Sequence, residues 1–303
     1  MLLPSRVRVL LAGYPELIAV LAAAVLGLSV QPPLAWLAGR QGINMLLVVL
    51  VFATAVAIDP AARRRLTGTW PSLLAVLAPG ITVLPALAWA VAQIVAAGPL
   101  RDGIMALGLA PCEIASVAIT ALAGGEAALA AGALIGSTVL TVAAAGPLLA
   151  LEADHATVHP GHIVASLALI VALPLAAGIA LRARTPLPAK AERTAAATAV
   201  AAVAALVALI AAEVHLSAGY LPVTLALIAF LAGSALTGWL LGARARHPAG
   251  VAVLLTTSMR DFAIAAGLAA AAFGPAAAAP LGLYGILVLV WGTAAAGIVR
   301  WRR

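Results

Sequence analysis

The chain has 303 residues, of which 65% are hydrophobic and 9% charged, and its mean hydropathy is +1.16. Because soluble domains carry about 25% charged residues, this composition excludes a soluble protein and predicts a polytopic membrane protein, whose partner is the lipid bilayer. The net charge of +7 does not indicate nucleic-acid binding, because the basic residues form short clusters between apolar stretches, and the single cysteine excludes an internal disulfide and a multi-cysteine metal site.

Ten apolar stretches follow one another along the chain. A transmembrane helix needs about 20 apolar residues, and each stretch meets that length approximately. The sequence therefore predicts an all-α membrane protein with ten transmembrane helices in one membrane domain. In chain order the stretches are Tyr14 to Val30, Ile43 to Ile58, Trp70 to Val95, Gly103 to Leu122, Ala127 to Leu151, His162 to Leu181, Ala195 to Ala212, Leu221 to Leu241, Ala249 to Phe273, and Ala276 to Val299.

The distribution of lysine and arginine predicts the orientation of these helices. Cytoplasmic loops of membrane proteins carry an excess of both residues. Fourteen of the 17 basic residues fall in alternate loops or at the two ends of the chain, only Arg40 and Arg101 fall in the opposite loops, and Arg260 lies within the ninth stretch. We expect a multi-pass protein of the plasma membrane with both termini in the cytoplasm.

Five helices followed by five more would place the second half upside down relative to the first, because five is odd. Such inverted repeats are common in secondary transporters, whose sites form where interrupted helices meet at the midplane. The sequence thus predicts one repeat over residues 1–151 and a second, inverted one over residues 152–303. The fourth and ninth stretches are both interrupted, by Leu109 to Ser116 and by Thr256 to Asp261.

The interruptions contain three charges within apolar stretches, Glu113, Arg260 and Asp261. An arginine or aspartate at the centre of a membrane helix costs about 2.5 to 3.5 kcal/mol and usually serves a function. Adjacent residues of an intact helix point about 100° apart, so Arg260 and Asp261 face one partner only if the helix is unwound there. The candidate substrate- and ion-binding residues are Glu113, Ser116, Thr256, Thr257, Ser258, Arg260 and Asp261.

Three short motifs, Pro111 to Ser116, Leu122 to Gly125 and Gly136 to Thr138, resemble those of the bile acid:sodium symporter family. That family reads Pro-Gly-Gly-x-Ala-Ser-Asn, then Leu-Ala-x-Gly, then Ser-Thr. Residues 249–275 and the first basic loop at residues 59–65 are also similar. The resemblance implies a panel domain of helices one, two, six and seven and a core domain of helices three to five and eight to ten. It further implies that unwound helices four and nine cross beside two sodium sites, and that an organic anion is carried between the domains.

The sequence departs from the family at the positions of the sodium ligands. Hard cations need several oxygen ligands, and a guanidinium beside such a site repels sodium, so we expect degenerate sodium sites. The departures are Val117 for an Asn, Ala130 and Leu134 for hydroxyl ligands in helix five, Thr256 for the shared Glu and Arg260 for a Gln in helix nine, and Pro79-Gly80 for a Gln in helix three.

Three interpretations of the charges remain open. Arg260 takes the place of sodium by pairing with Glu113 or Asp261, or binds the carboxylate of the substrate as a fork. Alternatively, Glu113 or Asp261 takes up the proton that drives transport, since burial disfavours a charged carboxyl group. The third interpretation is a structural ion pair that locks two crossing helices together.

The function favoured by these observations is secondary active transport of a small organic anion, with a proton or sodium as a possible second partner. The alternative is a proton-coupled transporter or cation/proton exchanger of the same architecture. An intramembrane enzyme would need an Asp-rich, His-Glu-x-x-His or Gly-x-Ser-x-Gly motif, and the sequence has none. We therefore expect no enzyme activity, no catalytic residue, no metal and no cofactor.

A second polar cluster lies between the fifth and sixth stretches. The spacing of its histidines could place metal ligands on one helix face. Pro160-Gly161 argues against an intact helix there, so we expect an exposed polar loop. The cluster contains Glu152, Asp154, His155, His159 and His162.

Overall fold

Every regular element that the computed structural model describes is a helix. The described residues are 15–57, 70–152, 160–185, 187–212 and 220–301. The helices are α2 (Pro15–Ser29), α3 (Gln31–Leu37), the π-helix η1 (Ala38–Gly42), α4 (Ile43–Ala57), α6 (Trp70–Ile81), α7 (Val83–Ala92), α8 (Pro99–Leu109), α9 (Ala115–Leu122), α10 (Ala127–Glu152), α11 (Pro160–Leu167), the π-helix η2 (Ala168–Ala172), α12 (Leu173–Arg184), α13 (Ala189–Ala212), α14 (Tyr220–Gly242), α15 (His247–Ser258), α16 (Phe262–Phe273), the 3-10 helix η3 (Pro275–Ala278) and α17 (Ala279–Trp301).

Seven helical stretches among these residues are long and apolar enough to cross a membrane. They coincide with seven of the ten predicted helices, as expected for a polytopic membrane protein. Of the other three predicted helices, the first is described only from Pro15 onwards, as the 15 residues of α2. The fourth and ninth apolar stretches are each divided into two shorter helices, α8 with α9 and α15 with α16. Ten crossings therefore remain a prediction.

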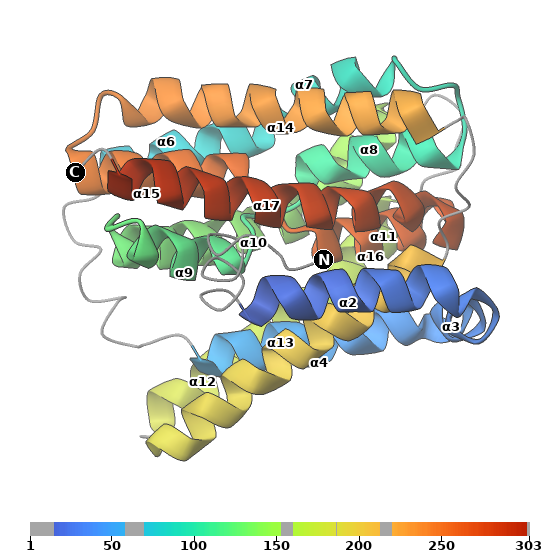
Figure 1. Cartoon of the computed structure of the whole chain (residues 1–303), viewed down its shortest axis with the longest axis horizontal. Helices are drawn as coiled ribbons and strands as arrows, with labels where there is room; N and C mark the ends of the chain where they lie inside the picture. The colour runs from blue at the N-terminus through green and yellow to red at the C-terminus, as the bar shows by residue number, and fades with distance from the viewer. Residues whose placement is uncertain (1–14, 58–69, 153–159, 186, 213–219, 302–303) are drawn as a thin grey trace, which may run out of the picture.

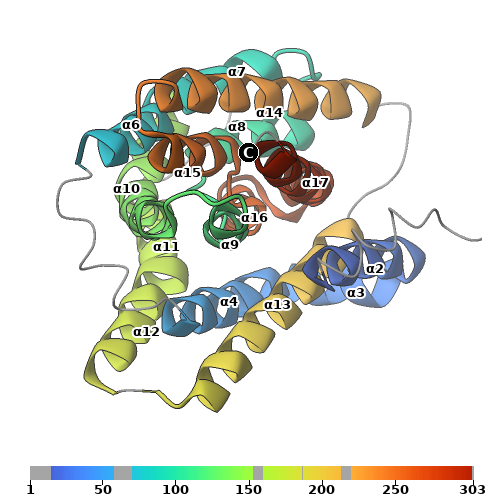
Figure 2. The same ribbon diagram turned by 60° about the vertical axis from the view of Figure 1, so that its left-hand side comes forward.

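The helices form two groups (Figure 1). In the first group α13 packs against both α2 and α4, and α12 packs against α4. In the second group α14 packs on α15, and α8 packs on both α7 and α16. Figure 2 shows the first group beneath the second, and contacts of α13 with α16 and α17 join them. A seam therefore runs between α4 and α13 on one side and α16 and α17 on the other.

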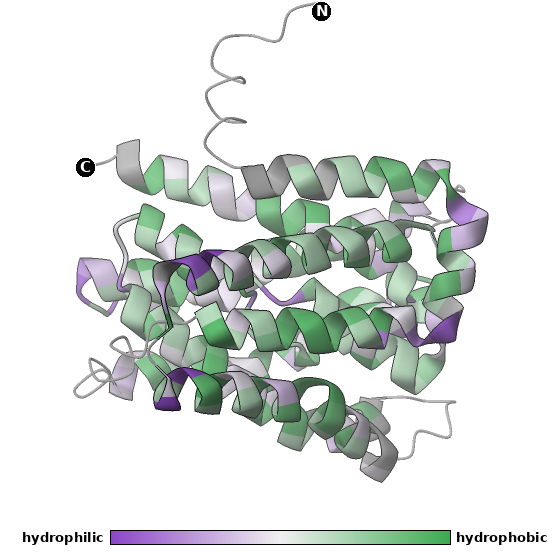
Figure 3. Ribbon diagram, turned by 90° about the horizontal axis from the view of Figure 1, so that it is seen from below, coloured by the Kyte–Doolittle hydropathy of each residue, from purple (hydrophilic) through white to green (hydrophobic). Residues whose placement is uncertain are grey.

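The outer surface of the helices is apolar. Figure 3 shows hydrophobic helix bodies, with the hydrophilic residues mostly at helix ends. Large apolar side chains such as Leu169 of η2, Leu221 of α14 and Trp239 of α14 are exposed. Helices satisfy their own backbone hydrogen bonds, which allows such a surface to face lipid.

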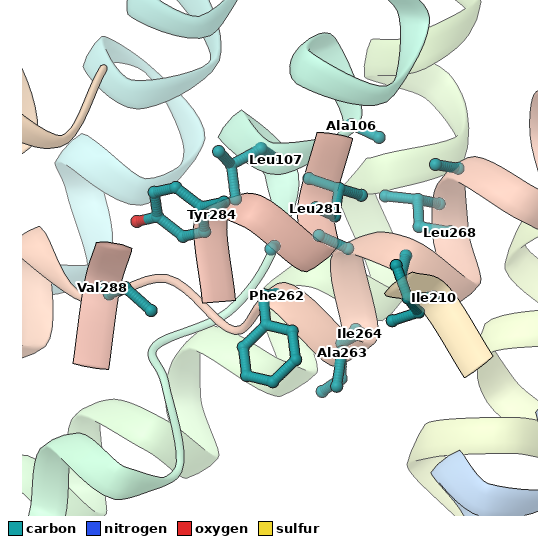
Figure 4. Packing of buried hydrophobic residues seen from close by; sticks show 14 of the residues in the cluster. Ala106, Leu107, Ile210, Phe262, Ala263, Ile264, Leu268, Leu281, Tyr284 and Val288 are labelled. Carbon is teal, nitrogen blue, oxygen red and sulfur yellow. The ribbon is translucent and has the colours of Figure 1, made fainter. Parts of the chain in front are cut away.

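Small residues bring the interior helices into close contact, as is usual for helix packing in membranes. A Cβ atom added at Gly108 of α8 would lie 2.6 Å from the Cβ of Ala88 and 2.8 Å from the carbonyl oxygen of Leu84, both in α7. Larger side chains fill the space at the start of α16, where Phe262 and Tyr284 are buried (Figure 4). Both kinds of packing surround the point at which the interrupted helices meet.

Candidate functional site

The two interruptions recognised in the sequence lie side by side in the interior. The chain leaves helical geometry between α8 and α9, and again between α15 and α16. The amide of Glu113 donates a hydrogen bond to the carbonyl of Met259 at 2.8 Å, and the amide of Asp261 donates to the carbonyl of Pro111 at 2.9 Å. These two bonds form an antiparallel bridge between the extended segments.

Four helix ends converge on this bridge, the C-terminal ends of α8 and α15 and the N-terminal ends of α9 and α16. A helix carries partial positive charge at its N-terminus and partial negative charge at its C-terminus. Asp261 caps α16, because its Oδ1 accepts a hydrogen bond from the amide of Ile264 at 2.8 Å. At the end of α8, the carbonyl of Leu109 accepts a hydrogen bond from the hydroxyl of Thr141 at 2.9 Å. The crossing is therefore held by both backbone and side-chain hydrogen bonds.

The extended backbone separates the charged side chains, because successive side chains of an extended segment point to opposite sides. Cys112 and Arg260 are the paired residues of the bridge and share one side. Glu113 and Asp261 follow them and share the other. The electrostatic interactions cross this division, since Arg260 interacts with both Cys112 and Asp261, and Glu113 also interacts with Asp261.

Arg260 is buried, with 1% of its surface exposed. Its Nη2 donates a hydrogen bond to the carbonyl oxygen of Ala110, at the end of α8, whereas its Nε and Nη1 have no hydrogen-bond partner. The guanidinium also faces Gly80 of α6, where an added Cβ would lie 3.5 Å from Nη2 and 3.7 Å from Nη1. Neither Glu113 nor Asp261 has a carboxylate oxygen within 4.0 Å of this group. The ion pair that the sequence allowed is therefore not formed in this conformation.

A cavity of ≈ 220 Å³ lies in the seam between the two helix groups, bounded by α4 and α13 on one side and by α9, α16 and α17 on the other. Glu113 is its one charged lining residue, and its Oε2 has no hydrogen-bond partner. Thr54 of α4 supplies an unpartnered hydroxyl, and the remaining lining residues are apolar, among them Ala199 of α13 and Phe262 of α16. The cavity thus offers a small apolar chamber with one carboxyl and one hydroxyl group.

The four hydroxyl candidates are buried at the helix ends that flank the bridge. The hydroxyl of Thr256 donates back to a carbonyl of its own helix at 2.7 Å, and that of Ser258 accepts from the indole of Trp291 at 2.9 Å. The hydroxyls of Ser116 and Thr257 have no partner. The hydroxyls of Ser116 and Thr257 are therefore free to form hydrogen bonds with a ligand, whereas those of Thr256 and Ser258 already form hydrogen bonds within the protein.

Two aromatic residues of α17 belong to this region, although the sequence analysis did not single them out. The hydroxyl of Tyr284 donates to the carbonyl of Ser258 at 3.4 Å, and Trp291 reaches the Ser258 hydroxyl. Buried tyrosine and tryptophan usually find a hydrogen-bond partner. Tyr284 and Trp291 could therefore have been recognised from the sequence as candidate members of a buried polar site, because each is a polar aromatic residue inside an apolar helix.

Several residues used in the sequence analysis lie outside the described part of the chain. Among the described residues, no group of three or more His, Cys, Asp or Glu side chains is placed to hold a metal ion. Two residues of the predicted polar loop lie in helices instead, Glu152 at the end of α10 and His162 in α11, which begins at Pro160 because proline is tolerated in the first turn of a helix. The loop stays an untested prediction for Asp154, His155 and His159. The residues outside the description include Arg6, Arg8, Arg63, Arg64, Arg65, Asp154, His155, His159, Arg302 and Arg303.

Comparison with known proteins supports the resemblance seen in the motifs. The model of the sodium bile acid symporter family matches residues 43–224, which is more than half of the chain. This match includes α4 to α13 and the interruption that contains Glu113. The curated proteins include none that matches this chain.

Proposed function

The chain belongs to the sodium bile acid symporter family, and we propose that it is a secondary active transporter that moves a small organic anion across the membrane by alternating access. The cavity between the two helix groups carries this proposal. Its volume of ≈ 220 Å³ suits a small organic molecule, and it adjoins the residues at which two interrupted helices meet. Sites of secondary transporters form at such meeting points.

The proposed architecture has ten crossings in two inverted repeats, residues 1–151 and 152–303. It requires that α2 with α3, α8 with α9, and α15 with α16 also cross the bilayer. The interruption of the fourth helix in each repeat supports this arrangement. The group around α4 and α13 would be the panel and the group around α8 and α15 the core, and their relative movement would open the cavity to each side in turn. The bias of Lys and Arg supports a plasma-membrane protein with cytoplasmic termini.

The charges at the crossing support coupling to protons. An ionised Glu113 would repel an organic anion strongly in an apolar cavity, so the carboxyl group has to be protonated when the anion is bound. The anion and a proton would then move together. Coupling to sodium has less support, because Thr256 and Arg260 stand at two positions where the family carries sodium ligands, and the buried guanidinium of Arg260 opposes a nearby cation.

A cation/proton exchanger of the same architecture is the second candidate. The observation that favours it is the lining of the cavity, where an acid is the one charged residue. A cation and a proton would then compete for Glu113, with the unpartnered hydroxyl of Thr54 as a further ligand.

Uptake into liposomes tests the proposal and separates these candidates. We expect an acidic exterior to drive accumulation of labelled small carboxylates, and a sodium gradient at equal pH to drive none. Glu113→Gln cannot release a proton, so it should retain counterflow of the anion while pH-driven accumulation falls at least about tenfold, the effect of roughly 1.4 kcal/mol. Glu126→Gln, which removes a partly exposed carboxylate outside the cavity, is the matched control.

Two results would contradict the proton-coupled anion transporter. Accumulation that follows the sodium gradient would show that sodium is the coupling ion. Proton movement that depends on an imposed cation gradient, with no carboxylate transported, would instead establish the exchanger.

A further inference from the structure

The buried guanidinium of Arg260 is the most unusual electrostatic feature of the described residues. Nε and Nη1 have no hydrogen-bond partner, and neither acid of the crossing lies within ion-pairing distance. A buried charge without a partner is strongly unfavourable. Asp261 attracts this cation only from beyond ion-pairing distance, so other groups must stabilise it directly.

The ends of two helices supply that stabilisation. Nη2 donates to the carbonyl of Ala110, the C-cap residue of α8, and α15 ends two residues before Arg260. Both are C-terminal ends, where a helix stabilises positive charge. In interrupted helices of secondary transporters, such ends and the unwound carbonyls beside them commonly coordinate a transported cation.

The opposite ends are matched by the opposite charge. Asp261 caps the N-terminus of α16, and Glu113 lies just before α9 in the same extended segment as Cys112. The acids therefore sit at positive helix ends, and the arginine sits at negative ones. Each charge lies at a helix end of opposite sign and none forms a direct ion pair, so removal of the arginine leaves the negative ends uncompensated.

We propose that the Arg260 guanidinium is a built-in cation that occupies, at the C-terminal ends of α8 and α15, the place of an exchangeable monovalent cation. This inference rests on the proposed function where it concerns transport, because a fixed guanidinium would balance the negative helix ends in every state of the transport cycle without an added ion. Whether a cation site exists can be tested without measuring transport. A variant without the guanidinium should gain a site for a small monovalent cation that the native protein lacks.

Thermal unfolding of the purified protein tests this inference without any transport measurement. The Tm of the native protein should be equal in sodium chloride and in choline chloride of the same concentration. Arg260→Ala in choline chloride should have a lower Tm, by roughly 5 °C, and sodium chloride should restore much of the loss. Arg260→Lys keeps a cation and should have the same Tm in both salts. Arg244→Ala removes an exposed arginine and should resemble the native protein.

Each other outcome decides against the inference. Equal Tm values for Arg260→Ala in sodium and choline would show that no cation replaces the guanidinium. A native protein stabilised by sodium as strongly as the variant would show that a cation site already exists. If Arg260→Ala cannot be purified, Arg260→Gln replaces it, and a Gln variant that folds in neither salt while Arg260→Lys folds would also overturn the inference. Because unfolding is measured, a liposome experiment that finds no anion transport leaves these outcomes unaffected.

Discussion

Asp261 has two roles that substitution can separate, a charge at the crossing and a cap on α16. Asparagine keeps the side-chain oxygen that accepts from the amide of Ile264, whereas alanine removes it. Loss of an N-cap costs about 1 kcal/mol. We therefore predict that Asp261→Ala lowers the Tm by about 2 to 4 °C and that Asp261→Asn leaves it nearly unchanged, as measured by thermal unfolding in detergent.

Comparison of the two variants also shows how much the negative charge of Asp261 contributes to the stability of the protein. If the carboxylate stabilises the crossing mainly through its charge, Asp261→Asn will lose as much stability as Asp261→Ala. That outcome would contradict the capping role, because both substitutions remove the charge and only one removes the acceptor.

The sequence identified the charged residues of the crossing but not their partners. Glu113, Arg260 and Asp261 could be recognised because each is costly in an apolar stretch. Their partners depend on which side of an extended segment each side chain takes, and a shift of one residue in the bridge would exchange those sides. The contact of Arg260 with the Ala110 carbonyl follows from that register. The register itself could not be predicted from the sequence.

At the scale of elements, the interruptions were predictable and their pairing was less so. Pro111 lacks an amide hydrogen and breaks the helical hydrogen-bond pattern, and the Arg-Asp step indicated a second break. The exact ends of α9 and α16 depend on caps and on the two hydrogen bonds of the bridge. The second predicted helix begins after η1, in which Gln41 has a φ of 66°. No sequence motif predicted this kink.

Gly108 allows α8 to lie against α7, and this contact places the end of α8 at the crossing. A Cβ at this position would meet the backbone of α7, with the Leu84 carbonyl oxygen at 2.8 Å and the Cα of Pro85 at 2.9 Å. Overpacking of this kind costs about 1 to 3 kcal/mol. We predict that Gly108→Ala lowers the Tm despite the better helix propensity of alanine.

A matched substitution isolates the steric effect. Gly297 of α17 has no atom within 4 Å of an added Cβ, so Gly297→Ala should leave the Tm unchanged or raise it slightly, since alanine is favoured over glycine in a helix by about 1 kcal/mol. Equal Tm values for the two alanine variants would show that α7 and α8 can move apart without loss of stability.

At the scale of the whole molecule, the apolar composition was enough to predict a polytopic helical protein, and seven stretches are helices of spanning length. The cavity could not be predicted in the same way. It is lined largely by alanine and other apolar residues of α4, α9 and α13, which in sequence resemble every other helix face of this alanine-rich chain. Only the assembly of the two helix groups distinguishes those faces from the lipid-facing ones.

A substitution that fills the cavity tests whether this seam is the transport route. Ala199 of α13 lines the cavity, and a phenylalanine there would occupy much of the ≈ 220 Å³. We predict that Ala199→Phe reduces liposome uptake at least about tenfold, an effect of roughly 1.4 kcal/mol, while the Tm changes little because the side chain enters empty space. Ala197→Phe places the same ring on an exposed position of the same helix and should transport normally. Full uptake by Ala199→Phe, with the protein correctly folded, would place the substrate elsewhere, because a filled chamber between α4 and α13 and the opposite helices cannot admit an organic anion beside Glu113.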